Sequence, residues 1–509
     1  MDKITKAINI GNKLQKTSKK FSELNWVKYT AGYDHGVEKA YDKIINILKS
    51  KKNFEVINEL LQKDISPLDR RRVDLLKKGF EPYHLSEELN ELDKRIQQVT
   101  MKLSGVNNKH RNKIDGKEVS LVEIFRILRE DDSKANRKKA FHALSQVNKP
   151  LVDNGFIELV NLRKEYAKLA GANNFVEYKL KRAELDFNTF NSWKNDVRSM
   201  ADKLKKTRNE YAVKYLKTPV LEPWDNAYLN SKIAPLMNVE VDMANYYKHI
   251  KDLYLKFGFD ITKNNVTYDI FPRKNKSEWG YFFTIDPKVD TRILANVQNR
   301  YNEFSVLLHE TGHALHDFSI DDEKDLLNDG ISNIIAEGFA NFFSSYLYDE
   351  MFYGNILDKK LHGKVKTQFK DLKKWNKINA MRAVGPILFD QELYKTDIKT
   401  LDDINQLKWK LDKELYNNDP YDGEPHWGYM IHHTTHPIML HSYFMGDVTF
   451  EMMRKVFCKK ENIKSINEKP KQFGKFMMKE LIKPSGRYTF NELFKRVSGE
   501  EFSLKYLND

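Results

Sequence analysis

The segment that most constrains this chain of 509 residues is His309-Glu310-Thr311-Gly312-His313, which lies within an apolar run. The flanking Val, Leu and Ala residues predict a buried helix. Because an α-helix has 3.6 residues per turn, His309 and His313 would lie one above the other on one face. Two imidazoles so placed can share a metal ion, and zinc accepts nitrogen ligands in tetrahedral geometry. Glu310 would point toward water beside the metal, in the general-base position of a zinc peptidase.

Five residues alone can match by accident, so a third ligand decides the matter. Residues 331–343 are apolar except at Ser332, Asn333, Glu337 and Asn341. A lone carboxylate in such a helix is costly to bury unless it is paired or bound to a metal, although it could also face solvent. Glu337 follows His313 by 24 residues, enough for one loop and a returning helix, and is therefore the predicted third ligand. Asn341, one turn further on, would orient a ligand histidine.

Histidines gather in the second half of the chain. Nine of the 14 lie between residues 309 and 441, and five of these lie within residues 426–441. When water adds to a peptide carbonyl an oxyanion forms, and a Tyr hydroxyl or a His N–H directed at it stabilises the transition state. The concentration of His and Tyr in residues 426–446 predicts that this segment contacts a reacting substrate.

Composition narrows the function classes. The first 20 residues lack the apolar segment of a secretory signal, no apolar run reaches 18 residues, and Cys458 is the single cysteine. These features predict a cytoplasmic protein with no membrane contact. The net charge is +14, but 86 basic residues alternate with 72 acidic ones and form no long arm, so we expect no nucleic-acid partner.

The apolar pattern is helical over most of the chain and changes just before the histidine motif. The expected helices cover residues 1–60, 68–105, 119–129, 133–147, 152–170, 188–216 and 241–257, with Ser66 and Ser133 as caps and a loop at residues 105–117. The expected strands cover residues 259–262, 266–271, 280–285 and 292–297. Such a sheet would either pack against the motif helix or offer an edge to an extended peptide.

Several of these motifs resemble one family. The run from His309 to His316 reads H-E-x-G-H-x-x-H, which resembles the zinc helix of M3-like zinc oligopeptidases, the thimet oligopeptidase and oligoendopeptidase F family. Ile334-Ile-Ala-Glu337 resembles its third-ligand segment, and the spacing matches that in angiotensin-converting enzyme. By this resemblance His433 and Tyr443, ten residues apart, are catalytic residues that bind the substrate carbonyl.

Other motifs resemble the thermostable carboxypeptidases. They are Asp290-Thr-Arg292, His426-Trp427 and residues 486–499, whereas the arginine motif of that group is only half present at Met381-Arg382-Ala383. Where relatives have further tyrosines this chain has His436 and His441, which the resemblance makes substrate-binding residues.

The resemblance implies a mainly α, two-lobed zincin peptidase with a deep central cleft and a small β-sheet beside the H-E-x-x-H helix. Residues 1–258 would form the N-terminal helical lobe and residues 259–509 the zinc-binding catalytic lobe. One zinc ion per chain would be held by His309, His313 and Glu337, the substrates would be short peptides, and the chain would be a monomer or homodimer.

Two alternatives stay open. The first is a carboxypeptidase or dipeptidyl carboxypeptidase, in which Arg292 or Arg382 captures the substrate carboxylate unless each is held in a structural ion pair. The second is a non-catalytic peptide-binding protein with a relic site, against which the intact Glu310 argues.

Overall fold

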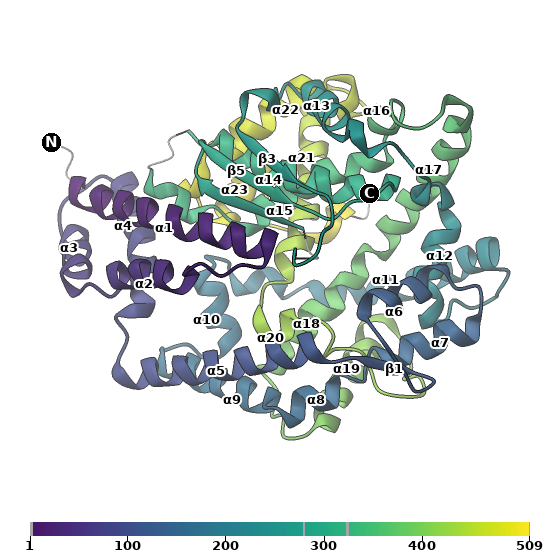
Figure 1. The fold of residues 1–509 in the computed structure, drawn as a ribbon, viewed down its shortest axis with the longest axis horizontal. Helices are drawn as coiled ribbons and strands as arrows, with labels where there is room; N and C mark the ends of the chain where they lie inside the picture. Colours follow the sequence, from purple (N-terminus) through teal and green to yellow (C-terminus); the bar gives the residue numbers. More distant parts are fainter. Residues whose placement is uncertain (1–3, 278–279, 322–324, 508–509) are drawn as a thin grey trace.

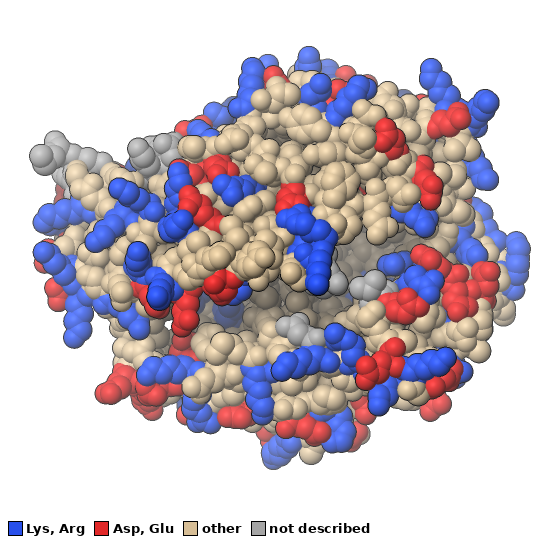
Figure 2. All heavy atoms as spheres, in the orientation of Figure 1, with Lys and Arg blue, Asp and Glu red and all other residues tan. Residues whose placement is uncertain are grey.

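The structure, a computed structural model, is mostly helical with two small sheets (Figure 1). It describes residues 4–277, 280–321 and 325–507. The expected fold class is confirmed: the chain is mainly α, and a three-stranded sheet lies against the helix that carries the H-E-x-x-H motif. Figure 2 shows this face of the molecule hollowed between the part that carries α1 and the part that carries α5.

The elements have the following bounds. The α-helices are α1 Thr5–Ala31, α2 Val37–Leu48, α3 Lys51–Leu61, α4 Pro67–Phe80, α5 Glu87–Lys109, α6 Leu121–Glu130, α7 Lys134–Ala143, α8 Asn148–Asp153, α9 Phe156–Leu169, α10 Phe175–Arg182, α11 Trp193–Leu216, α12 Asn226–Ile233, α13 Tyr246–Lys256, α14 Phe304–Ser319, α15 Asn333–Ser344, α16 Glu350–Tyr353, α17 His362–Asn379, α18 Val384–Leu393, α19 Leu401–Tyr416, α20 His432–Thr435, α21 His441–Glu461, α22 Pro470–Met477 and α23 Phe490–Ser498. The strands are β1 Asn112–Ile114, β2 Lys117–Val119, β3 Val266–Asp269, β4 Tyr281–Asp286 and β5 Asp290–Leu294.

The predicted helix starts are confirmed at two caps. The Ser66 hydroxyl accepts a hydrogen bond from the backbone N–H of Asp69, and Pro67 is the first residue of α4. The Ser133 hydroxyl likewise caps α7. In each case a side-chain oxygen satisfies an N–H that has no partner within the helix, so a local sequence pattern is enough to fix the boundary.

The strand expected at residues 259–262 is wrong. This segment leads into a short 3-10 helix, Ile261–Lys263. The Asp260 carboxylate accepts hydrogen bonds from both the backbone N–H and the hydroxyl of Thr262. Such local side-chain bonds compete with a strand ladder, which explains the difference.

The loop expected at residues 105–117 is also wrong in part. Helix α5 continues to Lys109, and β1 then pairs with β2 in an antiparallel hairpin. The hairpin turns at Asp115 and Gly116, whose φ angles are both positive, 50° and 79°. An Asp-Gly pair suits this turn, so the sequence contained a hairpin signal that its polar composition concealed.

The three-stranded sheet has the order β3-β5-β4, with β3 parallel and β4 antiparallel to the central strand β5. One face packs on α14 and the other on α1, where Trp26 meets Phe283 edge to face at 5.4 Å. In Figure 1 α1 crosses in front of the sheet. Helix α1 thus packs on strands that lie after residue 258 in the sequence. Helices α11 and α19 pack together across the same point of the chain.

Helices α14, α15 and α21 form the densest part of the core. Their backbones touch at glycines: a Cβ atom on Gly312 would lie 2.7 Å from Cα of Ala340, and one on Gly338 would lie 2.7 Å from the carbonyl oxygen of Gly446. No other residue leaves room for such an approach. The glycines thus allow three helices to meet more closely than side chains would permit.

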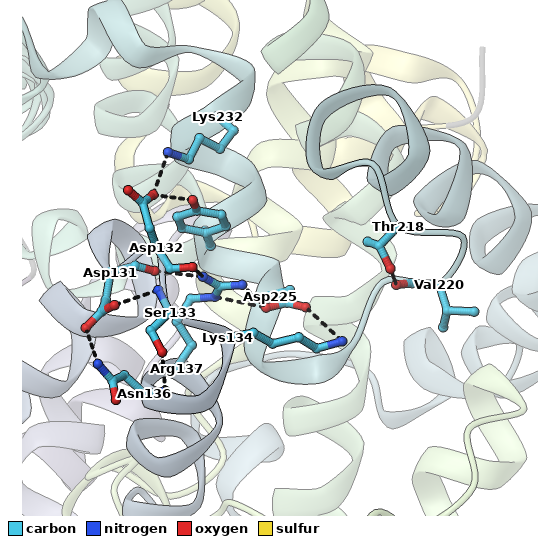
Figure 3. A network of polar contacts seen from close by, with 11 residues as sticks. Asp131, Asp132, Ser133, Lys134, Asn136, Arg137, Thr218, Val220, Asp225 and Lys232 are labelled. Carbon is cyan, nitrogen blue, oxygen red and sulfur yellow. Dashed lines mark hydrogen bonds and ion pairs between the residues drawn. The ribbon is translucent and has the colours of Figure 1, made fainter.

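A buried ion pair joins α7 to the segment before α12 (Figure 3). The Arg137 guanidinium donates to Asp225 from Nε at 2.9 Å and Nη2 at 2.7 Å, and both residues are almost fully buried. Its remaining nitrogen donates to the carbonyl oxygens of Asp131 and Asp132, and the group lies 3.9 Å over the Tyr228 ring. The network compensates both buried charges.

In the described residues no helix combines the length and the apolar character needed to cross a bilayer. Basic and acidic side chains alternate over the face shown in Figure 2.

We expect Arg137→Ala to lower the free energy of unfolding by about 3–5 kcal/mol, because it leaves the Asp225 carboxylate buried without a cation. Denaturant unfolding followed by circular dichroism measures this loss. Lys134→Ala is the matched control, since Lys134 is about half exposed and lies 4.0 Å from the same carboxylate. Equal destabilisation by the two substitutions would contradict the assignment.

Candidate metal centre

The three predicted metal ligands come together on two neighbouring helices. His309 and His313 lie one turn apart on α14, with their Nε2 atoms 3.1 Å from each other. Glu337 on α15 places Oε2 3.5 Å from Nε2 of His309 and 3.7 Å from Nε2 of His313. Among the described residues this is the one group of three or more His, Cys, Asp or Glu side chains arranged to hold a metal ion.

The chemistry of this donor set fits a metal. Oε2 of Glu337 is buried, and no residue in the described part of the chain gives it a hydrogen bond. Such an atom is costly to bury unless a cation compensates it. Two imidazole nitrogens and one carboxylate are a ligand set that zinc takes in catalytic sites, where a fourth position is left for water or substrate.

Burial shifts the proton affinities of the site. It lowers the pKa of His313 to about 3, with the charge of His309 acting in the same direction, so the ring is neutral as a ligand must be. Burial also lowers the pKa of His309, but the nearby carboxylates of Glu337 and Glu310 outweigh it, and the pKa is raised. Burial raises the pKa of Glu310 to about 7, against the opposing effect of His309.

Asn341 takes the supporting position expected for it. Its Nδ2 donates to Oδ1 of Asp447 at 2.8 Å, and its side chain raises the pKa of His309. Asn341 and Asp447 thus supply a polar environment beside one of the candidate ligand imidazoles. Sequence reasoning missed Asp447, although an acid within the apolar helix α21 is the same signal that identified Glu337.

Two further contacts hold α14 against the sheet. Tyr268 on β3 shares a hydrogen bond of 3.0 Å with the hydroxyl of Thr311, the middle residue of the motif. Phe282 on β4 stacks on the His313 ring, with centroids 6.0 Å apart. His316 is buried against Phe339 instead of facing the ligands. The sheet therefore packs against the motif helix and positions it, which is one of the two roles expected for the sheet.

Tyr443 faces this centre from α21. Burial raises the pKa of its hydroxyl, and the negative charges of Glu337 and Glu310 raise it further. The ring of His432 meets Tyr443 edge to face at 6.1 Å, and His436 lies 6.0 Å from His432. Tyr443 is thus within electrostatic reach of the ligands, and the histidine in ring contact with it is His432.

His433, which the ten-residue spacing selected, is buried in a separate cluster. Its Nδ1 lies 3.3 Å from Oδ1 of Asp390 on α18. His441 is buried with its ring edge-on to Phe190, and its pKa falls to about 4 through burial despite the charge of Asp390. His436 is exposed and hydrogen-bonds to the Thr435 hydroxyl. The substrate roles of these three histidines stay predictions.

No family model matches the sequence, and no curated protein matches it. Solved structures match the fold. PZ peptidase A with an inhibitor superimposes with a TM-score of 0.72 at 16% identity, over 95% of this chain and 86% of the other. The M32 carboxypeptidase of Deinococcus radiodurans R1 gives 0.68 at 11% identity, over 99% and 97%. A Bacillus anthracis protein assigned to oligoendopeptidase F gives 0.66 at 14% identity, over 95% and 86%. At these identities the likeness establishes the fold, and for the fold it confirms the resemblance to helical zinc peptidases.

We expect the wild-type protein to bind about one zinc ion per chain, because three ligands leave one exchangeable position. His313→Ala should weaken zinc affinity by at least about 100-fold, since it removes a direct ligand. Inductively coupled plasma mass spectrometry and competition with a zinc chelator measure both quantities. The control is His362→Ala, because His362 lies on α17, where its ring bonds to the carbonyl oxygen of Leu357 and contacts Tyr353 outside the site. Equal zinc content in the two variants would refute the ligand assignment.

Proposed function

We propose that this chain is a zinc-dependent peptidase that hydrolyses short peptides. The observation that carries the proposal is the convergence of His309, His313 and Glu337 within 4.8 Å of one another, next to a buried Glu310. A structural zinc site has no need of an additional carboxylate beside its ligands, whereas a hydrolytic site needs one to move a proton. The shared fold with peptidases supports the same reading.

Zinc in this ligand set supplies Lewis-acid activation of water. The Glu310 carboxylate accepts the proton that the attacking water loses and passes it to the nitrogen of the leaving amine. Gly280, just before β4, lies beside this carboxylate, and a Cβ atom there would lie 2.7 Å from Val306 on the same helix as Glu310. The Tyr443 hydroxyl donates to the carbonyl oxygen as it becomes an oxyanion. His433 is proposed as a second catalytic group, and His436 and His441 as substrate contacts.

The sheet supports a binding mode for the substrate. Within the described three-stranded sheet β4 pairs on one side only, with β5, and its Phe282 reaches the metal ligands. An extended peptide can add to such an edge by main-chain hydrogen bonds, which select length and conformation more than sequence. This mode favours short, unfolded substrates.

A carboxypeptidase activity is the second candidate, because M32 and Pyrococcus furiosus carboxypeptidases share the fold. It needs a cation for the substrate carboxylate. Arg292 is held by Asp290 in a two-pronged ion pair, as expected for a structural role. Arg382 stacks over the Tyr416 ring and lies near a second cation, Arg208. Of the two arginines it is therefore the better candidate to bind the substrate carboxylate.

Glu310→Gln tests the mechanism. We expect kcat on an internally quenched peptide to fall by about 10²–10⁴-fold, because the amide cannot accept a proton. Zinc content and melting temperature should match the wild type, since Gln has nearly the same shape. Undiminished hydrolysis in this variant would rule out Glu310 as the base.

Amidation of the substrate separates the two modes of cleavage. We expect the wild type to cleave an internally quenched peptide and its C-terminal amide at rates within about twofold, because edge pairing requires no terminal carboxylate. Mass spectrometry of the products locates the bond. A loss of about 100-fold on the amide, with release of C-terminal residues, would instead establish the carboxypeptidase, since a site built for a carboxylate leaves buried cations unpaired without it.

A further inference from the structure

A cavity opens directly beside the candidate metal ligands. It has a volume of about 520 Å³ and is bounded by α1, β4, α14, α15 and the short 3-10 helix η8, Leu326–Gly330. His313 and Glu337 form part of its wall, so it is continuous with the proposed active site. Its volume lies in the range of pockets that hold a small ligand, which makes it a candidate subsite for a residue next to the cleaved bond.

The charged side chains that line this cavity are acidic, whereas the chain as a whole is basic. Its described walls contain four carboxylates, Asp317, Asp325, Asp329 and Glu337, and no Lys or Arg, whereas the chain carries a net charge of +14. Two of the four have partners elsewhere: Asp325 is bound by Arg72 at 2.8 and 2.7 Å, and Glu337 belongs to the ligand set.

Asp317 and Asp329 are the two that remain. Asp317 lies one turn beyond His313 on α14, where it accepts hydrogen bonds from the Thr284 hydroxyl and the Lys288 backbone N–H, and it also feels the charge of Lys288. For Asp329, no side chain or backbone group in the described residues donates a hydrogen bond to the carboxylate or forms an ion pair with it. Loss of solvation raises the pKa of both carboxyl groups to about 6, which leaves them mostly ionised at neutral pH. Asp329 as a whole residue is exposed to solvent where it lines the cavity.

The segment that carries Asp329 is firmly held. The Arg72–Asp325 pair fixes the first end of η8. At the other end a Cβ atom on Gly330 would lie 2.7 Å from Leu75 and 3.0 Å from Cα of Gly486. A carboxylate held open to a cavity by a rigid backbone costs little to reorganise when a cation arrives.

We propose that Asp329, supported by Asp317, forms an anionic subsite that selects peptide substrates carrying a cationic group beside the cleaved bond. The group is either a Lys or Arg side chain or the free α-ammonium of the peptide. This inference rests on the proposed peptidase function. It adds the chemical class of the preferred substrate, which neither the metal ligands nor the fold specifies.

The test uses internally quenched peptides in which a single Lys is moved along a norleucine background, each with a free and an acetylated N-terminus. We expect one position at which Lys raises kcat/KM over norleucine by about 10-fold, the size of one partly desolvated charge pair. A side-chain cation shows as this Lys advantage in both the free and the acetylated series, whereas recognition of the α-ammonium shows as a loss of about 10-fold on acetylation with no Lys advantage. Both results support the subsite.

Asp329→Asn should reduce the ratio of Lys to norleucine to within about twofold of unity, and Asp329→Lys should lower it below unity, since the sign of the field is reversed. Asp321→Asn is the matched control, because Asp321 lies nearby in a surface ion pair with Lys483 and outside the cavity wall. It should keep the wild-type ratio. Melting temperature and zinc content report whether each variant is folded.

A binding measurement separates this inference from the proposed function. Fluorescence anisotropy gives the Kd of the labelled Lys and norleucine peptides for Glu310→Gln protein, which does not depend on turnover. Tighter binding of the Lys peptide, lost in Glu310→Gln/Asp329→Asn, supports the subsite even if the wild type cleaves no peptide. Cleavage without any preference for a cation, or a preference that survives Asp329→Asn, would overturn it.

Discussion

The close contact among α14, α15 and α21 is the constraint on which the site depends. Gly312 lets α14 touch the backbone of α15 at Ala340, and Gly338 and Gly446 let α15 touch α21. Helix axes ordinarily lie about 8–10 Å apart, depending on the side chains at the contact, and glycines allow the closest of these approaches. At the observed approach, two histidines from α14 and one glutamate from α15 meet within 4.8 Å. The third helix, α21, adds Tyr443 and Asp447. The glycines thus set how closely the side chains of the three helices approach one another.

This packing creates an electrostatic cost that the site itself must offset. Glu310, Glu337 and Asp447 are carboxylates within an apolar framework, and burial raises the pKa of Glu310 and of Asp447, each of which feels a neighbouring carboxylate as well. Hydrogen bonds offset part of the desolvation free energy of these carboxylates, as the bond from Asn341 to Asp447 does. The buried oxygen of Glu337 has no such donor in the described part of the chain. A bound dication is the compensation that fits, because carboxylates and imidazoles gain more from coordination than from water.

The sequence predicted the parts of this site that depend on local periodicity. His309, His313 and Glu337 stand out because a helical repeat places them in apolar helices, and the caps at Ser66 and Ser133 depend on four consecutive residues. Other features required knowledge of which helices meet. His432 and His433 are adjacent in sequence and equally plausible, yet one contacts Tyr443 and the other Asp390. Only the packing of α20 shows that the two histidines contact different helices, and the catalytic role that spacing assigned to His433 stays a prediction.

The net charge of the chain likewise does not predict the charge of the groups beside the site. A chain with 86 basic and 72 acidic residues has a basic average, but the two kinds alternate over the surface of Figure 2. At physiological salt, exposed charges are screened within about 8 Å, so this average has little effect inside a cleft. There the nearest groups dominate, and the wall beside His313 contains carboxylates. Because this negative charge comes from Asp317, Asp325, Asp329 and Glu337, which line one cavity with α1 and β4, the sign of the field at a site is a property of the fold and not of the composition.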